Sequence, residues 1–342
     1  MRAMVLAGHG GPEKLSLIEL ADPVPKAREV RVRVKACALN HLDLFVREGW
    51  PKLKLEMPHI LGSDIAGVID QAGAEVSDLA PGTPVLVNPG ISCGACKECL
   101  SGRDSLCRHY HILGETTRGG YAELVCVPRA NVLPMPRSLP FEQAAAVPLV
   151  FLTAWEMLVN RARVGPGETV LVHAAGSGVG SAAIQIAKLF GARVIATAGS
   201  RAKLDKAREL GADEVIHYEE TDFLAEVKRL TGRQGVEVVF EHTGAKTFER
   251  SVAALAVGGR LVTCGATSGF EAKLDLRVLF WKRISLLGST MGSKGELFQI
   301  LRLVEEGRLK PVLDQTLPLA DAPRAHRLME DRAQFGKLVL VP

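Results

Sequence analysis

The stretch Thr169–Ala198 reads TVLVHAAGSGVGSAAIQIAKLFGARVIATA and decides the fold of the second half of the chain. Its apolar start, 169–173, predicts a β-strand, the small residues at 174–180 predict a tight turn, and apolar residues at helical spacing follow. Gly191 stands where a helix would end, and a second apolar strand begins at Arg193. We therefore predict a strand–helix–strand unit of about 30 residues.

The glycine-rich turn has the chemistry of a phosphate site. Glycines let an anion approach the backbone closely, and the helix that follows offers free N–H groups and the positive end of its dipole. The strict G-x-G-x-x-G spacing is absent because Ser181 replaces the third glycine, but the turn lies between a strand and a helix, as such a site requires. A turn that only links the two elements is the alternative. The predicted dinucleotide contacts are Gly176, Ser177, Gly178, Val179 and Gly180.

Length and charge limit the possible functions. A chain of 342 residues is too long for one ordinary core, so two domains are expected. The net charge of +4 is modest and spread out, which gives no reason to expect a nucleic-acid partner. No apolar run approaches the length of a membrane helix, and the N-terminus lacks the apolar core of a signal peptide. We expect no membrane partner and a cytoplasmic location.

Residues 1–150 have the pattern of a β-rich domain. Alternating runs, β-branched residues and frequent Gly and Pro predict a mostly antiparallel sheet with few helices. The expected strands are 30–36, 60–72, 83–88 and 122–128.

Four of the seven cysteines are clustered, at Cys93, Cys96, Cys99 and Cys107. Three thiolates at intervals of three residues and a fourth eight residues later can surround one tetrahedral ion. Four thiolates leave no coordination position for a substrate, so the expected ion is a structural Zn²⁺ in a lobe at about 90–110. Four reduced thiols without a metal are the alternative.

From Phe151 onward, helical patterns alternate with short apolar strands, which predicts parallel α/β units and a doubly wound dinucleotide fold. Ligands of such a sheet bind at the carboxyl ends of its strands. This places Thr243, Gly265 and Met291 near the nicotinamide half of a dinucleotide. The expected strands are 169–173, 193–198, 214–217, 236–240, 260–264 and 283–288, with helices at 201–210 and 223–230 between them.

The residues after the second of these strands bear on the choice of cofactor. An acidic side chain there would bind the ribose 2′-hydroxyl of NAD, but the nearest acid is Asp205. Ser200, Arg201 and Lys203 offer groups for a 2′-phosphate instead, so we expect NADP(H) in preference to NAD(H). An ordinary solvated helix start is the alternative for these side chains.

The last segment, 292–342, is short for a domain. It is expected to contain helices at 294–306 and 321–330 and a strand at 336–341. We expect it to return to the first domain and complete it.

Together these features resemble the medium-chain dehydrogenase/reductase superfamily over essentially the whole chain. The resemblance implies a GroES-like catalytic domain at 1–150, a Rossmann domain with a six-stranded parallel sheet at 151–291, and a returning tail at 292–342. It also implies an active site in the cleft between the two domains.

The alcohol dehydrogenases of that superfamily hold a catalytic zinc, and this chain departs from them at each ligand. Their Cys-His-Thr-Asp run is here Asn40-His41-Leu42-Asp43, and their Gly-His-Glu run is Gly62-Ser63-Asp64. The third ligand would fall in Ala144–Thr153, which has neither Cys nor His.

The quinone oxidoreductases of the superfamily are more similar at these places. They carry Asn and Asp at the positions of Asn40 and Asp43, a phosphate-binding Lys at that of Lys203, and a Tyr near the adenine at that of Tyr218. The resemblance therefore implies an NADPH-dependent reductase of quinones or α,β-unsaturated carbonyls. Asn40 would polarise the substrate carbonyl and Asp43 would orient it, although both residue types are also common turn formers.

Two other functions stay open at this point. Cys37, His41, His59 and Asp64 offer substitute ligands for a zinc-dependent alcohol dehydrogenase, and a non-catalytic NADPH-binding protein is a third possibility. The apolar edge strand expected at 283–288 favours a homodimer or homotetramer. Candidate residues of a substrate pocket are Phe45, Trp50, Phe151, Phe270 and Trp281.

Overall fold

A computed structural model describes all 342 residues, and they form two compact units. The first unit contains Met1–Leu149 and Ser293–Pro342, and the second contains Val150–Gly292. These limits lie next to the boundaries predicted at 150 and 291.

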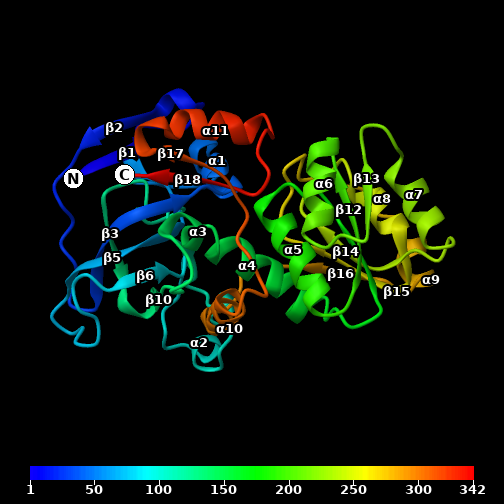
Figure 1. The fold of residues 1–342 in the computed structure, drawn as a ribbon, viewed down its shortest axis with the longest axis horizontal. Coiled ribbons are helices and arrows are strands. Elements are labelled where there is room, and N and C mark those ends of the chain that lie inside the picture. Colours follow the sequence, from blue (N-terminus) through cyan, green and yellow to red (C-terminus); the bar gives the residue numbers. More distant parts are fainter. The chain divides into compact units, whose positions relative to one another are not determined.

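The first unit is built on antiparallel strands, as its alternating sequence predicts (Figure 1). Its main sheet has the strand order β10-β6-β5-β3-β18-β17, with β9 also paired to β3, and two small sheets are β2-β1-β4 and β7-β8. The strands are β1 (Arg2–Leu6), β2 (Leu15–Glu19), β3 (Glu29–Ala38), β4 (His59–Ile60), β5 (Asp64–Ala72), β6 (Pro84–Val87), β7 (Gly90–Ile91), β8 (His111–Ile112), β9 (Leu124–Pro128), β10 (Val132–Pro134), β17 (Leu313–Pro318) and β18 (Lys337–Val341).

Strand β3 shows why the sheet forms. Val30, Val32 and Val34 are buried on one face, whereas Arg31 and Arg33 point the other way and pair with Asp70. A period of two with one apolar and one charged face fits a half-buried strand.

The last segment completes this sheet. Strand β18 pairs antiparallel with β3 through Val339 and Ala38 and through Leu340 and Cys37. Strand β17 pairs parallel to β18 and was not predicted, because its sequence LDQTLP lacks apolar alternation. The single strand predicted at 60–72 was wrong in its continuity, since β4 and β5 are separate and residues 61–63 interrupt them.

The helices of the first unit are short, and the sequence analysis missed several of them. No helix was predicted at Asn40-His41-Leu42-Asp43, where a turn was the alternative to a catalytic role, but this run begins a helix, α1, because Asn and Asp are favoured at helix starts as well as in turns. The helices are α1 (His41–Glu48), α2 (Lys97–Leu100), α3 (Phe141–Ala145), α10 (Lys294–Glu305) and α11 (Ala322–Glu330), with single turns η1 (Pro12–Lys14), η2 (Asp104–Leu106), η3 (Arg129–Asn131) and η5 (Leu319–Asp321).

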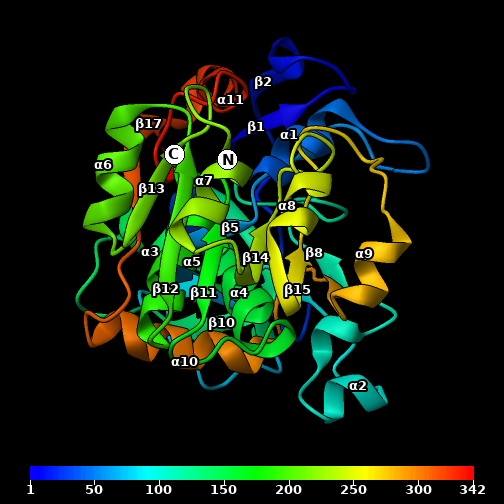
Figure 2. The same ribbon diagram turned by 90° about the vertical axis from the view of Figure 1, so that its right-hand side faces the viewer.

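The second unit is a parallel six-stranded sheet, which confirms the doubly wound prediction. Its order is β13-β12-β11-β14-β15-β16, and Figure 2 shows β12, β11, β14 and β15 side by side. The strands are β11 (Thr169–Val172), β12 (Arg193–Ala198), β13 (Glu214–His217), β14 (Val236–Glu241), β15 (Leu255–Thr263) and β16 (Ser285–Gly288). The helices are α5 (Gly178–Leu189), α6 (Arg201–Glu209), α7 (Phe223–Leu230), α8 (Phe248–Ala254) and α9 (Leu276–Trp281).

An apolar helical stretch, Phe141–Arg161, contains the boundary between the units and includes α4 (Pro148–Trp155) and the π-helical segment η4 (Glu156–Arg161). By length and composition alone it could cross a membrane, although the sequence analysis expected no such segment. Most of its side chains are buried inside the protein, as in the core helix of a globular domain.

Candidate functional site

The four clustered cysteines come together in the first unit as a donor set that could hold a metal ion. All four sulfur atoms lie within 4.8 Å of one another, and the Cys96–Cys99 and Cys107–Cys93 sulfurs are 3.5 Å apart. Tetrahedral zinc with bonds of about 2.3 Å needs sulfurs about 3.8 Å apart, so the donor set fits the ion. Backbone N–H groups of Ala95 and Cys96 lower the pKa of Cys93 to about 6, which favours the thiolate that binds metal.

Hydrogen bonds and an ion pair connect the cysteine lobe to the start of α10. The Lys294 ammonium donates to Asp104 at 3.0 Å and to Ser92 at 2.7 Å, and the Lys294 backbone N–H donates to the other Asp104 oxygen at 2.9 Å. Ser92 directly precedes Cys93, and Asp104 lies between Cys99 and Cys107 in sequence, so this ion pair joins the lobe to the segment that returns from the second unit.

The predicted phosphate turn of the second unit is built as a helix N-terminus. Ser177 caps α5, and its hydroxyl accepts the Gly180 N–H at 2.9 Å. The first N–H groups of a helix have no acceptor within it, so those of Gly178 and Val179 are available to an anion. Ala174 takes a left-handed conformation with φ of 47° to enter the turn.

Gly180 explains why the turn needs a small residue at its end. A Cβ on Gly180 would lie 2.5 Å from the Ala174 carbonyl oxygen and 2.9 Å from the Ser177 hydroxyl. The glycine therefore allows the start of α5 to lie close to the turn that follows β11, and the residues present fit a bound diphosphate.

The end of β12 carries the groups predicted for cofactor selection. Ser200 caps α6, and its hydroxyl accepts the Lys203 N–H at 3.4 Å. The Arg201 guanidinium is exposed and lies 3.4 Å from the Glu220 carboxylate. Tyr218 packs over this turn, because a Cβ on Gly199 would meet the Tyr218 hydroxyl at 2.6 Å.

Asn40 and Asp43 lie in a buried polar cluster of the first unit. The Asp43 carboxylate accepts the Asn40 backbone N–H at 2.7 Å and the Gly62 N–H at 3.0 Å. The Asn40 amide donates to Asp64 at 3.0 Å, and its oxygen accepts from the Lys337 ammonium at 2.5 Å. The amide group of Asn40 therefore faces inward, toward charged partners.

Lys337 completes this cluster and was not predicted from the sequence. Its ammonium also donates to Asp64 at 3.0 Å, and the second Asp64 oxygen accepts the Leu149 N–H at 2.8 Å. Both charged side chains are almost fully buried. Burial raises the pKa of Asp43 to about 6, although the N–H donors of Asn40 and Gly62 and the charge of Lys337 act against that shift.

The alternative set of catalytic zinc ligands does not come together. The Cys37 thiol is fully buried, and a Cβ on Gly62 would lie only 2.7 Å from its sulfur. The His59 Nε2 bonds the Gly114 carbonyl at 3.1 Å, and the His41 ring lies against Phe45 on α1. Asp64 is already paired with Lys337, so these four donors do not fit a metal as the structure stands.

Comparison with known proteins agrees with this architecture. The family model of the alcohol dehydrogenase GroES-like domain matches residues 26–137, and that of the zinc-binding dehydrogenase matches residues 178–306. A quinone oxidoreductase of Rattus norvegicus is 32% identical over 349 aligned residues, which cover 100% of this chain and 98% of the relative.

The chain belongs to the medium-chain dehydrogenase/reductase superfamily.

Other members of the superfamily carry different names. An NAD-dependent alcohol dehydrogenase of Saccharolobus solfataricus is 34% identical, with all of both chains covered. The crystal structure of a protein named NAD-dependent alcohol dehydrogenase is 56% identical in sequence, with a TM-score of 0.97 and full coverage of both chains. This chain is therefore a nicotinamide-dinucleotide-dependent oxidoreductase of the superfamily, and its relatives divide between two substrate classes.

In this dehydrogenase/reductase, the other predicted dinucleotide contacts lie at strand ends of the second unit. Thr243 and Gly265 follow β14 and β15, and the Gly265 carbonyl accepts the Thr263 hydroxyl at 3.1 Å. Met291 is buried and has a left-handed φ of 54°. The candidate residues of a substrate pocket differ in burial. Phe151 is buried, Phe45 is half-buried, and Phe270, Trp281 and Trp50 are exposed.

The sequence analysis missed the charged residues that support the site. Lys337 lies almost 300 positions from Asn40, and only the pairing of β18 with β3 brings the two together. His173 was predicted as the last residue of the strand at 169–173, and Glu241 directly follows the strand predicted at 236–240, but no contact between the two was predicted. Charged or titratable residues inside predicted buried strands were the signal available, because such residues are rarely buried without partners.

Proposed function

We propose that this protein reduces quinones or α,β-unsaturated carbonyl compounds with a nicotinamide dinucleotide and without a catalytic metal. The observation that carries the proposal is the cluster of Asn40, Asp64 and Lys337. Within the two runs that match those of the alcohol dehydrogenase ligands, this cluster holds the amide of Asn40 and the carboxylate of Asp64, which is already paired with an ammonium. The relatives named quinone oxidoreductase support the same function.

The chemistry of such substrates suits a site without a metal. The bound dinucleotide supplies a hydride from its nicotinamide ring, and a proton from water completes the two-electron reduction. Because the conjugated acceptor spreads the developing negative charge, the protein needs to supply position and the exclusion of water rather than a Lewis acid. Residues of the glycine turn, Ser177–Gly180, would hold the diphosphate.

Asn40 and Asp43 are proposed to act at this site mainly by fixing its shape. Asp43 holds the backbone of Asn40 and Gly62, and these residues begin α1 and precede β5. The Asn40 amide can polarise a substrate carbonyl only if it gives up its bond to Asp64 or Ala38. We therefore expect Asn40→Ala to lower kcat, and full activity in this variant would remove Asn40 from the mechanism.

We further propose that the cofactor is NADPH rather than NADH. No acidic side chain lies between the end of β12 and Asp205 on α6, and Ser200, Arg201 and Lys203 supply a hydroxyl and two cationic groups there. Steady-state rates with the two dinucleotides measure the preference. A higher kcat/KM for NADPH is expected, whereas a higher value for NADH would overturn this part of the proposal and agree with the name of the Saccharolobus relative.

The substrate class is tested by following dinucleotide oxidation at 340 nm with 1,4-benzoquinone and with 2-cyclohexenone. Turnover of either compound, unchanged by a chelator in the assay, is the expected result. Tight dinucleotide binding without turnover of any quinone or enone would favour a non-catalytic binding protein instead.

The second candidate is an alcohol dehydrogenase, which the name of the 56% identical protein of known structure favours. That activity with these residues would require a metal on substitute ligands. Oxidation of benzyl alcohol by NAD⁺ or NADP⁺, lost on chelation while the fold stays intact, would replace the first proposal.

We also propose a cytoplasmic location for the protein. We further propose that it forms a homodimer or homotetramer in which subunits pair through β16, the last strand of its sheet. Strand β16 presents an unpaired edge, and β-strand edges invite pairing with a second copy. Sedimentation at micromolar concentration is expected to give at least a dimer, and Leu287→Asp is expected to shift it toward the monomer. A monomeric wild-type protein would contradict the proposed pairing.

A further inference from the structure

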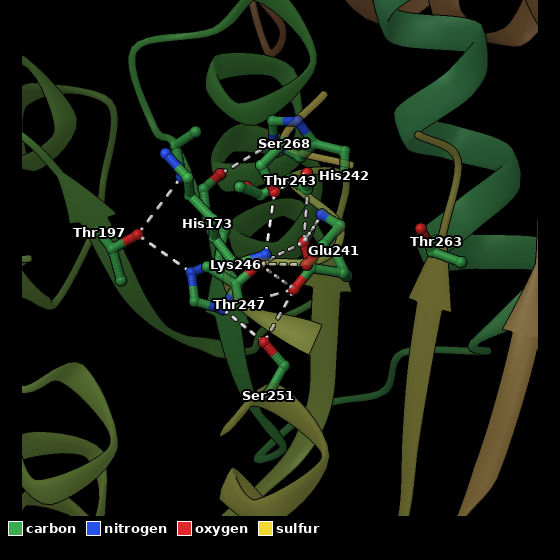
Figure 3. A network of polar contacts seen from close by, with 12 residues as sticks. His173, Thr197, Glu241, His242, Thr243, Lys246, Thr247, Ser251, Thr263 and Ser268 are labelled. Carbon is green, nitrogen blue, oxygen red and sulfur yellow. Dashed lines mark hydrogen bonds and ion pairs between the residues drawn. The ribbon is translucent and has the colours of Figure 1, made fainter. Parts of the chain in front are cut away.

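The carboxylate of Glu241 is the most heavily bonded acidic group of the second unit (Figure 3). It lies at the end of β14 and is completely buried. One oxygen accepts the backbone N–H groups of Thr243 at 2.7 Å and Gly244 at 3.1 Å. The other accepts the Ser251 hydroxyl at 2.8 Å, and the Thr247 hydroxyl lies about equally close to both oxygens.

His173 extends these contacts from β14 to β11 and β12. Its Nε2 lies 2.9 Å from the Ser251 hydroxyl, and its Nδ1 lies 3.2 Å from the Thr197 hydroxyl. The single proton of Ser251 goes to Glu241, so Nε2 carries a hydrogen and donates to Ser251. In the neutral ring Nδ1 then accepts from Thr197, and burial holds the pKa of His173 below its ordinary value.

The contacts therefore run in one direction without a break. Thr197 donates to His173, His173 donates to Ser251, and Ser251 donates to Glu241. Burial alone would raise the pKa of Glu241, but the Ser251 hydroxyl and the backbone N–H groups of Thr243 and Gly244 lower it below the ordinary value. An ionised acceptor strengthens hydrogen bonds in a buried site.

The same chain of contacts crosses the switch point of the sheet. The strand order β13-β12-β11-β14-β15-β16 reverses direction between β11 and β14, and dinucleotides bind outside the carboxyl ends at such a point. Thr197 lies at the end of β12, His173 follows β11, and Glu241 ends β14. The chain thus joins the strands of the adenosine half of the site to those of the nicotinamide half.

Glu241 also sets the conformation of the loop beyond it. Its two backbone donors hold Thr243 and Gly244 in place, and the Thr243 carbonyl accepts both the hydroxyl and the N–H of Ser268 at 2.7 Å. Ser268 lies after β15, so the loops after β14 and β15 are bonded to each other. A Cβ on Gly244 would lie 2.7 Å from the Gly269 carbonyl, which shows how closely these loops pack.

We propose that Glu241, acting through Ser251 and His173, is a positioning residue that couples the two halves of the dinucleotide site. The carboxylate keeps the loops of the nicotinamide half in register with the glycine turn that follows His173. It is not assigned a contact with substrate or cofactor. The proposal rests on dinucleotide binding by this superfamily and is independent of the proposed substrate class.

Isothermal titration of the full-length protein with NADPH and with its fragment 2′-phospho-ADP-ribose tests the coupling without any substrate. If NADH binds more tightly, NADH and ADP-ribose are the matching pair. Glu241→Gln is expected to weaken dinucleotide binding at least tenfold and fragment binding less than threefold. In this variant the side-chain amide at position 241 has one NH₂ group in place of an acceptor oxygen, and that group faces other hydrogen-bond donors. The loops of the nicotinamide half therefore lose part of the hydrogen bonding that holds them.

Glu237→Gln is the matched control. Glu237 lies on the same strand, β14, and accepts the Thr169 N–H at 2.7 Å at the other end of the sheet. It is expected to leave both affinities within twofold of the wild type. Loss of dinucleotide and fragment binding by equal factors in Glu241→Gln would overturn the proposal, as would unchanged binding of both.

Ser251→Ala keeps the test available if Glu241→Gln fails to fold. This variant removes only the hydroxyl that connects Glu241 to His173. A loss of dinucleotide affinity at least three times larger than the loss of fragment affinity is expected. Equal effects on the two ligands would contradict the coupling.

Discussion

Lys337 and Asp64 form a buried ion pair in the first unit, and Asn40 bonds both of them. Two charges taken out of water stabilise a fold only when each keeps its partner and its hydrogen bonds. Here the second Asp64 oxygen is satisfied by a backbone N–H of Leu149. Removing one of the two charges should therefore lower the free energy of unfolding, because the other charge then stays buried without a partner.

Lys337→Met is expected to lower the free energy of unfolding by about 3–5 kcal/mol, because it leaves the Asp64 carboxylate buried without a counter-ion. Urea denaturation measures the change. Lys188→Met is the control, since Lys188 and Asp213 form a partly exposed pair that should contribute about 0–1 kcal/mol. A change below about 1 kcal/mol in Lys337→Met would show that Asp64 does not depend on this ammonium.

A second residue gives a pH dependence. His326 is buried, its Nδ1 accepts from Arg47 at 3.2 Å, and its Nε2 lies 3.3 Å from the Tyr121 hydroxyl. Burial, together with the charge of Arg47, lowers the pKa of His326 to about 3. In the unfolded chain the pKa is about 6.5, so as the pH falls below about 6.5 only the unfolded chain takes up this proton.

Because only the unfolded chain protonates His326, the free energy of unfolding should fall by about 1.4 kcal/mol per pH unit as the pH falls from about 6.5 toward about 3. His326→Asn lacks this proton, so its deficit in stability against the wild type is expected to shrink between about pH 7.5 and about pH 5. Thermal midpoints at the two pH values measure the deficit. The exposed His111→Asn should show no such change, and a constant deficit in His326→Asn would contradict the assignment.

Among the elements, α5 shows how a local sequence produces a binding surface. Its N-terminus is fixed by the Ser177 cap and by the close approach of Gly180 to Ala174. Both features come from residues that were recognisable in the sequence, because the turn lies between an apolar strand and a helix.

Gly180→Ala is expected to weaken dinucleotide binding at least tenfold, because the new methyl group meets the Ala174 carbonyl and forces the turn apart. Quenching of protein fluorescence by NADPH measures the affinity. Gly165→Ala is the control in the same unit, where the nearest atom to the new methyl group is 4.0 Å away. Equal affinities of the two variants would show that this close approach does not shape the phosphate turn.

Elements whose own periodicity is strong were predictable, and those defined by distant partners were not. The strands of the parallel sheet are short apolar runs, and the sequence analysis located all six of them. Strand β17 and helix α1 were missed because β17 is polar and the start of α1 has the composition of a turn. Their structure depends on pairing with β18 and on the Asp43 contacts, which local patterns do not reveal.

At the scale of the whole molecule, the candidate site also has parts that were predictable from local sequence and parts that depend on distant residues. The cysteine lobe and the glycine turn are local motifs: the four cysteine sulfurs lie close together, and the turn forms the start of α5. The Asn40 cluster and the Glu241 chain of contacts join residues from distant parts of the sequence. Sequence spacing carries no information on such contacts until the topology of the sheets is known.

We expect one metal ion to bind per chain, at the cysteine lobe, and hydride transfer to need no second ion. The zinc content of the full-length protein, purified without added zinc or chelator and measured by inductively coupled plasma mass spectrometry, tests this expectation most directly. About one zinc per chain is the predicted result. About two zinc ions per chain would contradict it, because a second ion would have to displace Lys337 from Asp64 or recruit the ligands around Cys37.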